Sequence, residues 1–157
     1  MNKSTPTRPA IPEPDYDDPK ELYAFFGLAA YCIQLLEQGL LNLLVGLRLS
    51  GNQTPVWADA GMLYDEGDRK TLGQLLNAVH EIVPFEATLD GHLQEALRKH
   101  NYLTHHFFVE DDEDLLSDRR RREMIDELQE SIRFFKVIDS QVCGGNLIMS
   151  ELFAENG

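Results

Sequence analysis

The stretch ELYAFFGLAAYCIQLLEQGLLNLLVGLRL, residues 21–49, is the most apolar part of this 157-residue chain and decides its fold class. Between Leu22 and Leu47 the only charged residue is Glu37. The run is long enough to cross a membrane, but no basic flank of the positive-inside kind accompanies it. A narrow polar stripe also recurs along it at spacings of three and four: Tyr23, Gly27, Tyr31, Gln34, Gln38 and Asn42. The pattern favours a long helix, buried on most sides, in a bundle that also pairs with a second copy.

Apolar residues recur at helical spacing in two segments of the middle of the chain, which predicts two more helices. Thr71 and Gln74 fit a capping box at the start of the first, and Pro84 should end it. The second is expected over about residues 88–108. Between the long apolar helix and the capping box, residues 50–69 are rich in glycine and contain a proline, which predicts a loop with one turn over residues 56–64.

The last long helix should begin at Ser117 or Asp118 and end at Gly144 and Gly145, with a short terminal helix over residues 146–153. Its expected buried positions are Met124, Ile125, Leu128, Ile132, Phe135, Ile138 and Val142. No segment has a convincing strand pattern. The predicted class is therefore all-α, a bundle of four to five helices.

The composition indicates the number of domains and the cellular compartment. Five of the seven prolines lie in residues 1–19, without the apolar core of a signal peptide, so this segment is expected as an extended tail before a single domain over residues 20–157. The net charge of -13 disfavours non-specific binding of nucleic acid. Cys32 and Cys143 form no spaced motif, which favours two buried thiols in a reducing cytosol and predicts a cytoplasmic protein without a membrane span.

Three of the five histidines lie in RKHNYLTHHFF, residues 98–108. With Leu93 at the centre of the buried face of this helix, His100 and Thr104 are expected to be buried. His100 is then either a core histidine, with a partner from residues 34–42 of the first helix, or part of a site. His106 points to the other flank, where Glu110 is four residues away; a third ligand is missing there, so neither a metal nor another cofactor is predicted.

A second flank of the same helix carries the candidate site. Arg98 and His105 are seven residues apart, so they share a face and lie about 10 Å apart along the axis. An arginine can donate two parallel hydrogen bonds to a phosphate group, and a histidine can accept and donate protons near neutral pH. Asn101 lies between them and could orient the histidine or a substrate. Arg98, Asn101 and His105 together predict a site that binds and reacts with a phosphate group, above all if two copies of the chain pair across this face.

The order His100-Asn101-Tyr-Leu-Thr-His105, followed by His106-Phe107-Phe108, resembles the motif of the HEPN superfamily of small all-α domains. That motif is Arg, Asn, three residues and His on the penultimate long helix, often with aromatics after it. The resemblance covers about residues 21–143. It matches His105 to the family histidine and Asn101 to the polar residue after the arginine. His100 stands where the family has arginine, and Arg98 lies at the edge of the spacing that the family tolerates.

The resemblance implies a homodimer, through the helices expected over residues 21–49 and 88–108, and two alternative functions. One is a non-catalytic interaction or regulatory module of a bacterial defence or toxin–antitoxin system, with RNA or a protein as partner. The other is a metal-independent endoribonuclease, in which His105 exchanges protons and Arg98 stabilises the phosphorane. Asn101, Tyr102 and His100 would then contact the substrate. Residues 119–122, four arginines, would either capture RNA or neutralise the acidic residues 110–114.

Overall fold

The computed structural model describes residues 11–51, 59–109 and 117–154, with side chains described to residue 144. These residues form five helices and no strand, which confirms the all-α class. The helices are α1 (Glu21–Ser50), α2 (Ala60–Gly67), α3 (Leu72–Ile82), α4 (Ala87–His105) and α5 (Asp118–Ala154).

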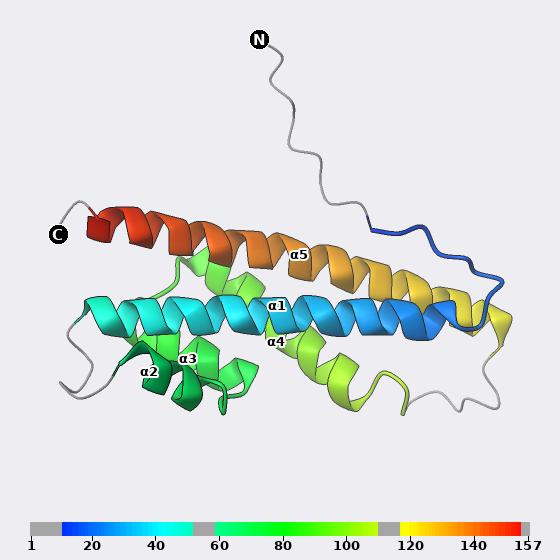
Figure 1. Ribbon diagram of the computed structural model, residues 1–157. Helices are drawn as coiled ribbons and strands as arrows, with labels where there is room; N and C mark the ends of the chain where they lie inside the picture. The colour runs from blue at the N-terminus through cyan, green and yellow to red at the C-terminus, as the bar shows by residue number, and fades with distance from the viewer. Residues whose placement is uncertain (1–10, 52–58, 110–116, 155–157) are drawn as a thin grey trace, which may run out of the picture.

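The two longest helices, α1 and α5, form the frame of the bundle. Figure 1 shows them side by side and running in the same direction. The helices α2 and α3 pack against α1, whereas α4 packs mainly against α5 and touches α3. The helix that carries the predicted site therefore crosses the frame at an angle, with its C-terminal end near the N-terminal half of α1 (Figure 1).

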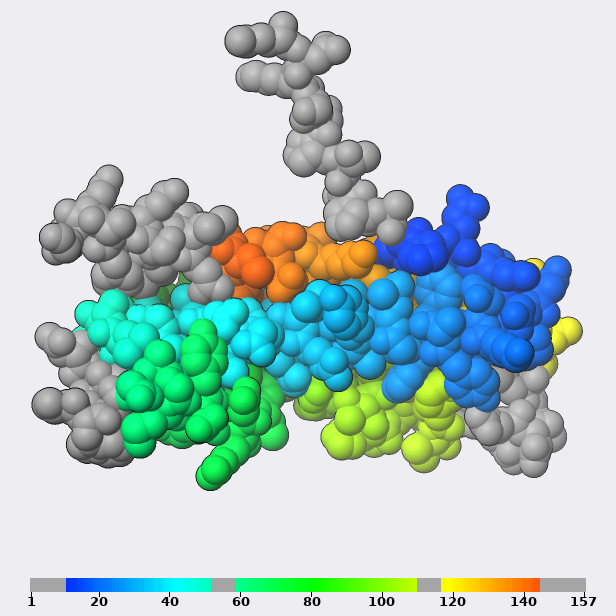
Figure 2. Space-filling model, viewed as in Figure 1, coloured from blue at the N-terminus to red at the C-terminus, as the bar shows by residue number. Residues whose placement is uncertain are grey.

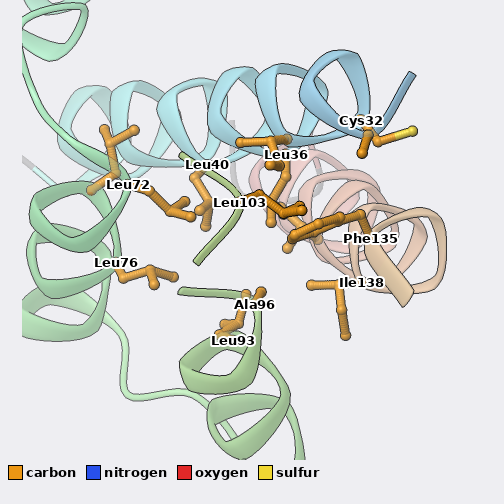
Figure 3. Packing of buried hydrophobic residues seen from close by; sticks show 14 of the residues in the cluster. Cys32, Leu36, Leu40, Leu72, Leu76, Leu93, Ala96, Leu103, Phe135 and Ile138 are labelled. Carbon is orange, nitrogen blue, oxygen red and sulfur yellow. The ribbon is translucent and has the colours of Figure 1, made fainter. Parts of the chain in front are cut away.

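The core lies where the four larger helices meet. Figure 3 shows Leu36 and Leu40 of α1 pointing toward Leu72 of α3 and Leu103 of α4. From α5, Phe135 and other apolar side chains complete the cluster. All seven positions predicted to be buried on this last helix are buried: Met124, Ile125, Leu128, Ile132, Phe135, Ile138 and Val142. Helical periodicity thus identified the inward face of α5 correctly.

Local signals set the bounds of α3 and the start of α4. The capping box is confirmed: the Thr71 hydroxyl accepts from the Gln74 N–H at 3.3 Å, and the Gln74 side chain accepts from the Thr71 N–H at 2.9 Å. The helix ends two residues before Pro84, as predicted. The Glu86 carboxylate caps α4 by accepting from the Leu89 N–H at 3.3 Å. This helix ends at His105, three residues before the expected end.

The predicted end of the last helix at Gly144 is wrong, because α5 continues through Gly144 and Gly145 to Ala154. A glycine inside a helix costs only about 1 kcal/mol, so neighbouring turns can hold it in helical conformation. Just before it, the buried Val142 lies close to Gly39 of α1, where an added Cβ would be 3.5 Å from the valine side chain. Packing against α1 therefore supports the helix where the sequence signal predicted a stop.

The segment predicted as a loop also contains a helix, α2, which begins where the Asp59 side chain accepts from the Met62 N–H at 2.9 Å. Of the turn expected over residues 56–64, residues 56–58 lie outside the described residues, and its second half coincides with the start of α2. Gly67, the last residue of α2, is buried against α1. A Cβ there would lie 2.1 Å from a methyl carbon of Leu41, so only glycine lets α2 approach α1 this closely.

Residues 11–19 are extended or form turns, as expected, but they do not lie outside the fold. The Tyr16 hydroxyl donates to Asp126 of α5 at 2.5 Å and accepts from the Gln129 side chain at 3.2 Å. Asp17 forms an ion pair with Arg122 at 2.7 Å, and the guanidinium of this arginine lies 5.6 Å from the Tyr16 ring centre. The expected boundary at residue 20 needs correction, because these polar and aromatic contacts attach the segment to α5.

Within the described part of the chain, α1 is the one helix that is long and apolar enough to cross a membrane, judged by length and composition only. Half of its most apolar window is buried inside the bundle. Core helices of soluble proteins have the same property, because burial among other helices selects the same residues. The arrangement is that of a helical protein of the soluble type.

Candidate functional site

The predicted site residues all lie on the second half of α4, but they have different neighbours. Arg98 is exposed, with 69% of its side chain accessible, and it is paired with Glu95 one turn earlier. Its Nε donates to the Glu95 carboxylate at 2.9 Å, and its Nη2 contacts the same oxygen. This pair holds the pKa of the Glu95 carboxyl below its usual value. The charge of Arg98 is thus already compensated within its own helix.

His100 is half-buried between α4 and α1, with 19% of its side chain exposed. Its Nε2 lies 3.8 Å from the Glu37 carboxylate of α1, and its Nδ1 lies 3.1 Å from the side-chain oxygen of Asn101. The polar stripe of Gln34, Gln38 and Asn42 was expected to offer a partner; the contact comes instead from Glu37, which lies between these residues in the sequence and does not belong to the stripe. The histidine joins two helices through polar contacts.

Thr104 is exposed, so its predicted burial is wrong. The buried residues of α4 are Leu93, Ala96 and Leu103. Their mean direction is rotated away from Leu93 toward Leu103, which carries Thr104 out of the core. The sequence analysis took Leu93 as the centre of the buried face, whereas the mean direction of the three buried residues is rotated by roughly 50° from it.

Asn101 and His105 are exposed, and Tyr102 is half-buried. The ring centres of His105 and His106 are 6.4 Å apart. The Tyr102 ring packs edge-to-face on the Phe107 ring, with ring centres 6.1 Å apart. Phe107 also stacks with Phe26 of α1. Tyr102 is thus one member of an aromatic cluster that fastens the end of α4 to α1.

A polar groove of about 300 Å³ lies between α4 and α5 and includes two of the predicted residues, Arg98 and Tyr102. The other lining residues are Glu95, Lys99, Glu127, Glu130 and Ser131. His105 does not line it. Three carboxylates against two cations make the groove a poor receptor for a phosphate group. A single chain therefore does not bring Arg98 and His105 together in one recess.

The four arginines at the start of α5 are each paired with a carboxylate. Arg119 lies 3.0 Å from Glu123, and Arg121 lies 2.9 Å from Asp118. The guanidinium of Arg120 lies 3.0 Å from a Glu127 oxygen, and Arg122 contacts Asp17 as described above. Most of these partners are three to seven residues away on the same helix, a spacing that the sequence pattern could have identified. The acidic residues 110–114 lie outside the described residues.

The fully exposed residues of α1 include no charged side chain, and the charged residues of the helix, Glu21, Glu37 and Arg48, are half-buried, with 34% of the Glu37 side chain exposed. The fully exposed residues are Tyr23, Ala24, Gly27, Tyr31, Gln34, Leu35, Gln38, Asn42, Gly46, Leu49 and Ser50, which we call the uncharged α1 face. From first to last they span about 40 Å at 1.5 Å per residue. A Cβ added at Gly27 or Gly46 would meet nothing within 4 Å. Figure 2 shows α1 across the front of the molecule, with the end of α4 directly below it.

Several polar groups on this face have partners within the chain. The Asn42 side-chain oxygen accepts from Gln38 at 3.0 Å and from the Tyr64 hydroxyl of α2 at 3.1 Å. Tyr31 is 55% exposed and Leu35 is 41% exposed. Exposed large side chains at these levels, with few charges around them, are typical of the surfaces that proteins use to contact one another.

Metal ligands do not gather in the described part of the chain: no group of three His, Cys, Asp or Glu side chains there could hold an ion. Glu110, considered with His106 as a possible pair, lies outside it. Comparisons with protein-family models, with curated proteins and with solved structures found no match for this chain.

Proposed function

We propose that this protein is a non-catalytic interaction module that forms a homodimer through the uncharged α1 face, with the end of α4 beside it. The observation that carries the proposal is the lack of charged side chains among the fully exposed residues of a 30-residue helix in a chain of net charge -13. Charged residues make up 26% of the sequence, so a face of eleven exposed residues without one is unusual for a surface that only meets water.

Electrostatics favours a second copy as the occupant of this face. Two molecules of the same strong negative charge repel each other wherever carboxylates face carboxylates. An uncharged strip is the place where they can approach with the least repulsion. Amide and hydroxyl groups, such as those of Gln34 and Tyr31, both donate and accept, so each can pair with its own copy across a two-fold axis. Gly27 and Gly46 leave room for a close approach of the two helices.

The charged residues around the predicted site on α4 favour a non-catalytic interaction module and disfavour a nuclease. The arginine that would stabilise a phosphorane, Arg98, is engaged by Glu95, and the groove beside it holds two further carboxylates, Glu127 and Glu130. In a HEPN-like arrangement the exposed Asn101 and His105 would then make hydrogen bonds at or near the dimer contact. We infer a cytoplasmic regulatory component, of the kind found in bacterial defence or toxin–antitoxin systems, that acts by binding a protein or RNA partner.

Sedimentation velocity over a range of concentrations tests the dimer. The Gln34→Glu variant adds one carboxylate to the uncharged α1 face of each copy, and the Gln141→Glu variant adds the same charge to an exposed position on α5. We expect the wild type and Gln141→Glu to dimerise, and Gln34→Glu to dissociate at least about tenfold more readily, because like charges then face each other. A wild-type protein that stays monomeric at high micromolar concentration would overturn the proposal.

A further inference from the structure

A second pocket lies at the opposite end of the bundle from the aromatic cluster, where α1, α3, α4 and α5 meet. It has a volume of about 250 Å³. The floor consists of Leu47, Val79 and Val142, which are almost completely buried. The other lining residues are Leu43, Val83, Pro84, Phe85, Glu86, Leu89 and Gln141. Nearly all of this surface is aliphatic or aromatic, so it favours an apolar ligand body.

The only charged side chain that lines this pocket is Glu86. Its carboxylate accepts from backbone N–H groups of Thr88 and Leu89 at the start of α4, and these bonds lower the pKa of Glu86, with His92 a smaller contributor. The group is therefore ionised at neutral pH, and it lies exposed to solvent at the rim of the pocket. Among the described residues no lysine or arginine forms an ion pair with it.

We propose that this pocket binds a small apolar molecule with a cationic head, such as an alkyl- or arylammonium. The apolar body would rest on the floor formed by Leu47, Val79 and Val142, and the ammonium would contact the Glu86 carboxylate, with the Gln141 amide as a second acceptor. A carboxylate has more acceptor positions than the two N–H groups occupy, so it can bind the cation and still cap α4. The volume is slightly below the usual range for ligand sites, which restricts the body to about six to eight carbons.

Selection by charge follows from the same geometry. An anionic ligand of equal length would place its carboxylate against Glu86 in a molecule that is already strongly negative. A neutral alcohol would keep the apolar contacts and lose the ionic one. The proposal goes beyond the dimer, because none of the lining residues belongs to the uncharged α1 face.

Titration of the full-length protein with n-hexylammonium, hexanoate and 1-hexanol, followed by heteronuclear NMR, tests the site. We expect the ammonium to shift the amide signals of the lining residues, such as Val83 and Leu89, and to bind about five- to tenfold more tightly than hexanoate. Glu86→Gln should remove this preference while keeping the cap, since the glutamine oxygen still accepts from N–H groups. Glu81→Gln, which removes the same charge from an exposed position outside the pocket, should leave the preference unchanged.

A variant in which the pocket opening is blocked provides a second, independent test of the site. Val83 is 41% exposed in the pocket wall, so Val83→Trp should fill the opening with little damage to the core and abolish binding. Equal binding of hexylammonium and hexanoate would refute the role of Glu86, as would an equal effect of Glu81→Gln. The absence of shifts at the lining residues up to millimolar hexylammonium would refute the pocket itself. Dimerisation is measured separately, so failure of one proposal does not affect the other.

Discussion

Replacement of Gly67 by alanine should destabilise the protein, although alanine normally strengthens a helix. The added Cβ would lie 2.1 Å from the Cδ1 carbon of Leu41. Carbon atoms in contact are normally at least about 3.5 Å apart, so the two groups must separate by roughly 1.4 Å. Leu41 is only 3% exposed, and a change of its rotamer would displace other core side chains.

The expected magnitude follows from two opposing effects. Overpacking of a well-packed core costs about 1–3 kcal/mol. The higher helix propensity of alanine returns at most about 1 kcal/mol, and less at the last residue of a helix. We therefore expect Gly67→Ala to lower the free energy of unfolding by about 1–2 kcal/mol. Gly91→Ala is the matched control: this glycine is exposed in α4 with nothing within 4 Å of its Cβ position, so the change should stabilise by about 0.5–1 kcal/mol.

Urea unfolding followed by far-UV circular dichroism, at one fixed protein concentration, measures both changes. A double-mutant cycle with Leu41→Ala isolates the contact, because the smaller side chain removes the obstacle. In that background Gly67→Ala should be neutral or slightly stabilising, which corresponds to a coupling energy of about 1–3 kcal/mol. If Gly67→Ala stabilises the wild type as much as Gly91→Ala does, or if the coupling is near zero, the close approach of α2 to α1 is wrong.

The remaining predictions concern the N-terminal segment and the α4 residues. The hydrogen bond that the Tyr16 hydroxyl donates to Asp126 raises the pKa of Tyr16 above its usual 10.0. A raised folded-state pKa means that this contribution to stability is complete below about pH 10 and is lost as the pH rises through the folded value; unfolding measured between pH 9 and 11 should show the loss in the wild type and not in Tyr16→Phe. With RNA in EDTA we expect no cleavage by the wild type, Arg98→Ala or His105→Ala; cleavage by the wild type that both variants abolish would instead establish the endoribonuclease alternative.

Most of the helices could be predicted because their signals are local. The apolar run of residues 21–49 and the capping box of Thr71 and Gln74 each act within a few turns of the chain, and α1 and α3 follow them closely. The prediction failed at Gly144, where packing outweighs a weak helix-stop signal. It also reduced α2 to a single turn within a loop, although the Asp59 cap and contact with α1 stabilise a short helix there.

The candidate site was predicted only in part. The helix and the exposure of Arg98, Asn101 and His105 followed from the period of 3.6 residues, and the Glu95 partner of Arg98 was visible three positions earlier. The contact of His100 with Glu37 joins residues 63 positions apart, so its partner could be narrowed to a region of the first helix but not to one residue. The groove beside Arg98 depends on carboxylates of α5, which no spacing on α4 reveals.

The sequence by itself determined that this protein is an all-α bundle built on one long apolar helix, and it showed that a polar, nearly charge-free stripe runs along that helix. Only the tertiary structure decided which part of the stripe stays exposed, how Tyr16 attaches the N-terminal segment to α5, and that an apolar pocket beside Glu86 opens where four helices meet. The physical reason is the distance along the sequence over which each signal acts. Helical periodicity repeats every few residues, so any short stretch contains it. Exposure and cavities depend on which helices become neighbours, and that is settled by the packing of the whole chain.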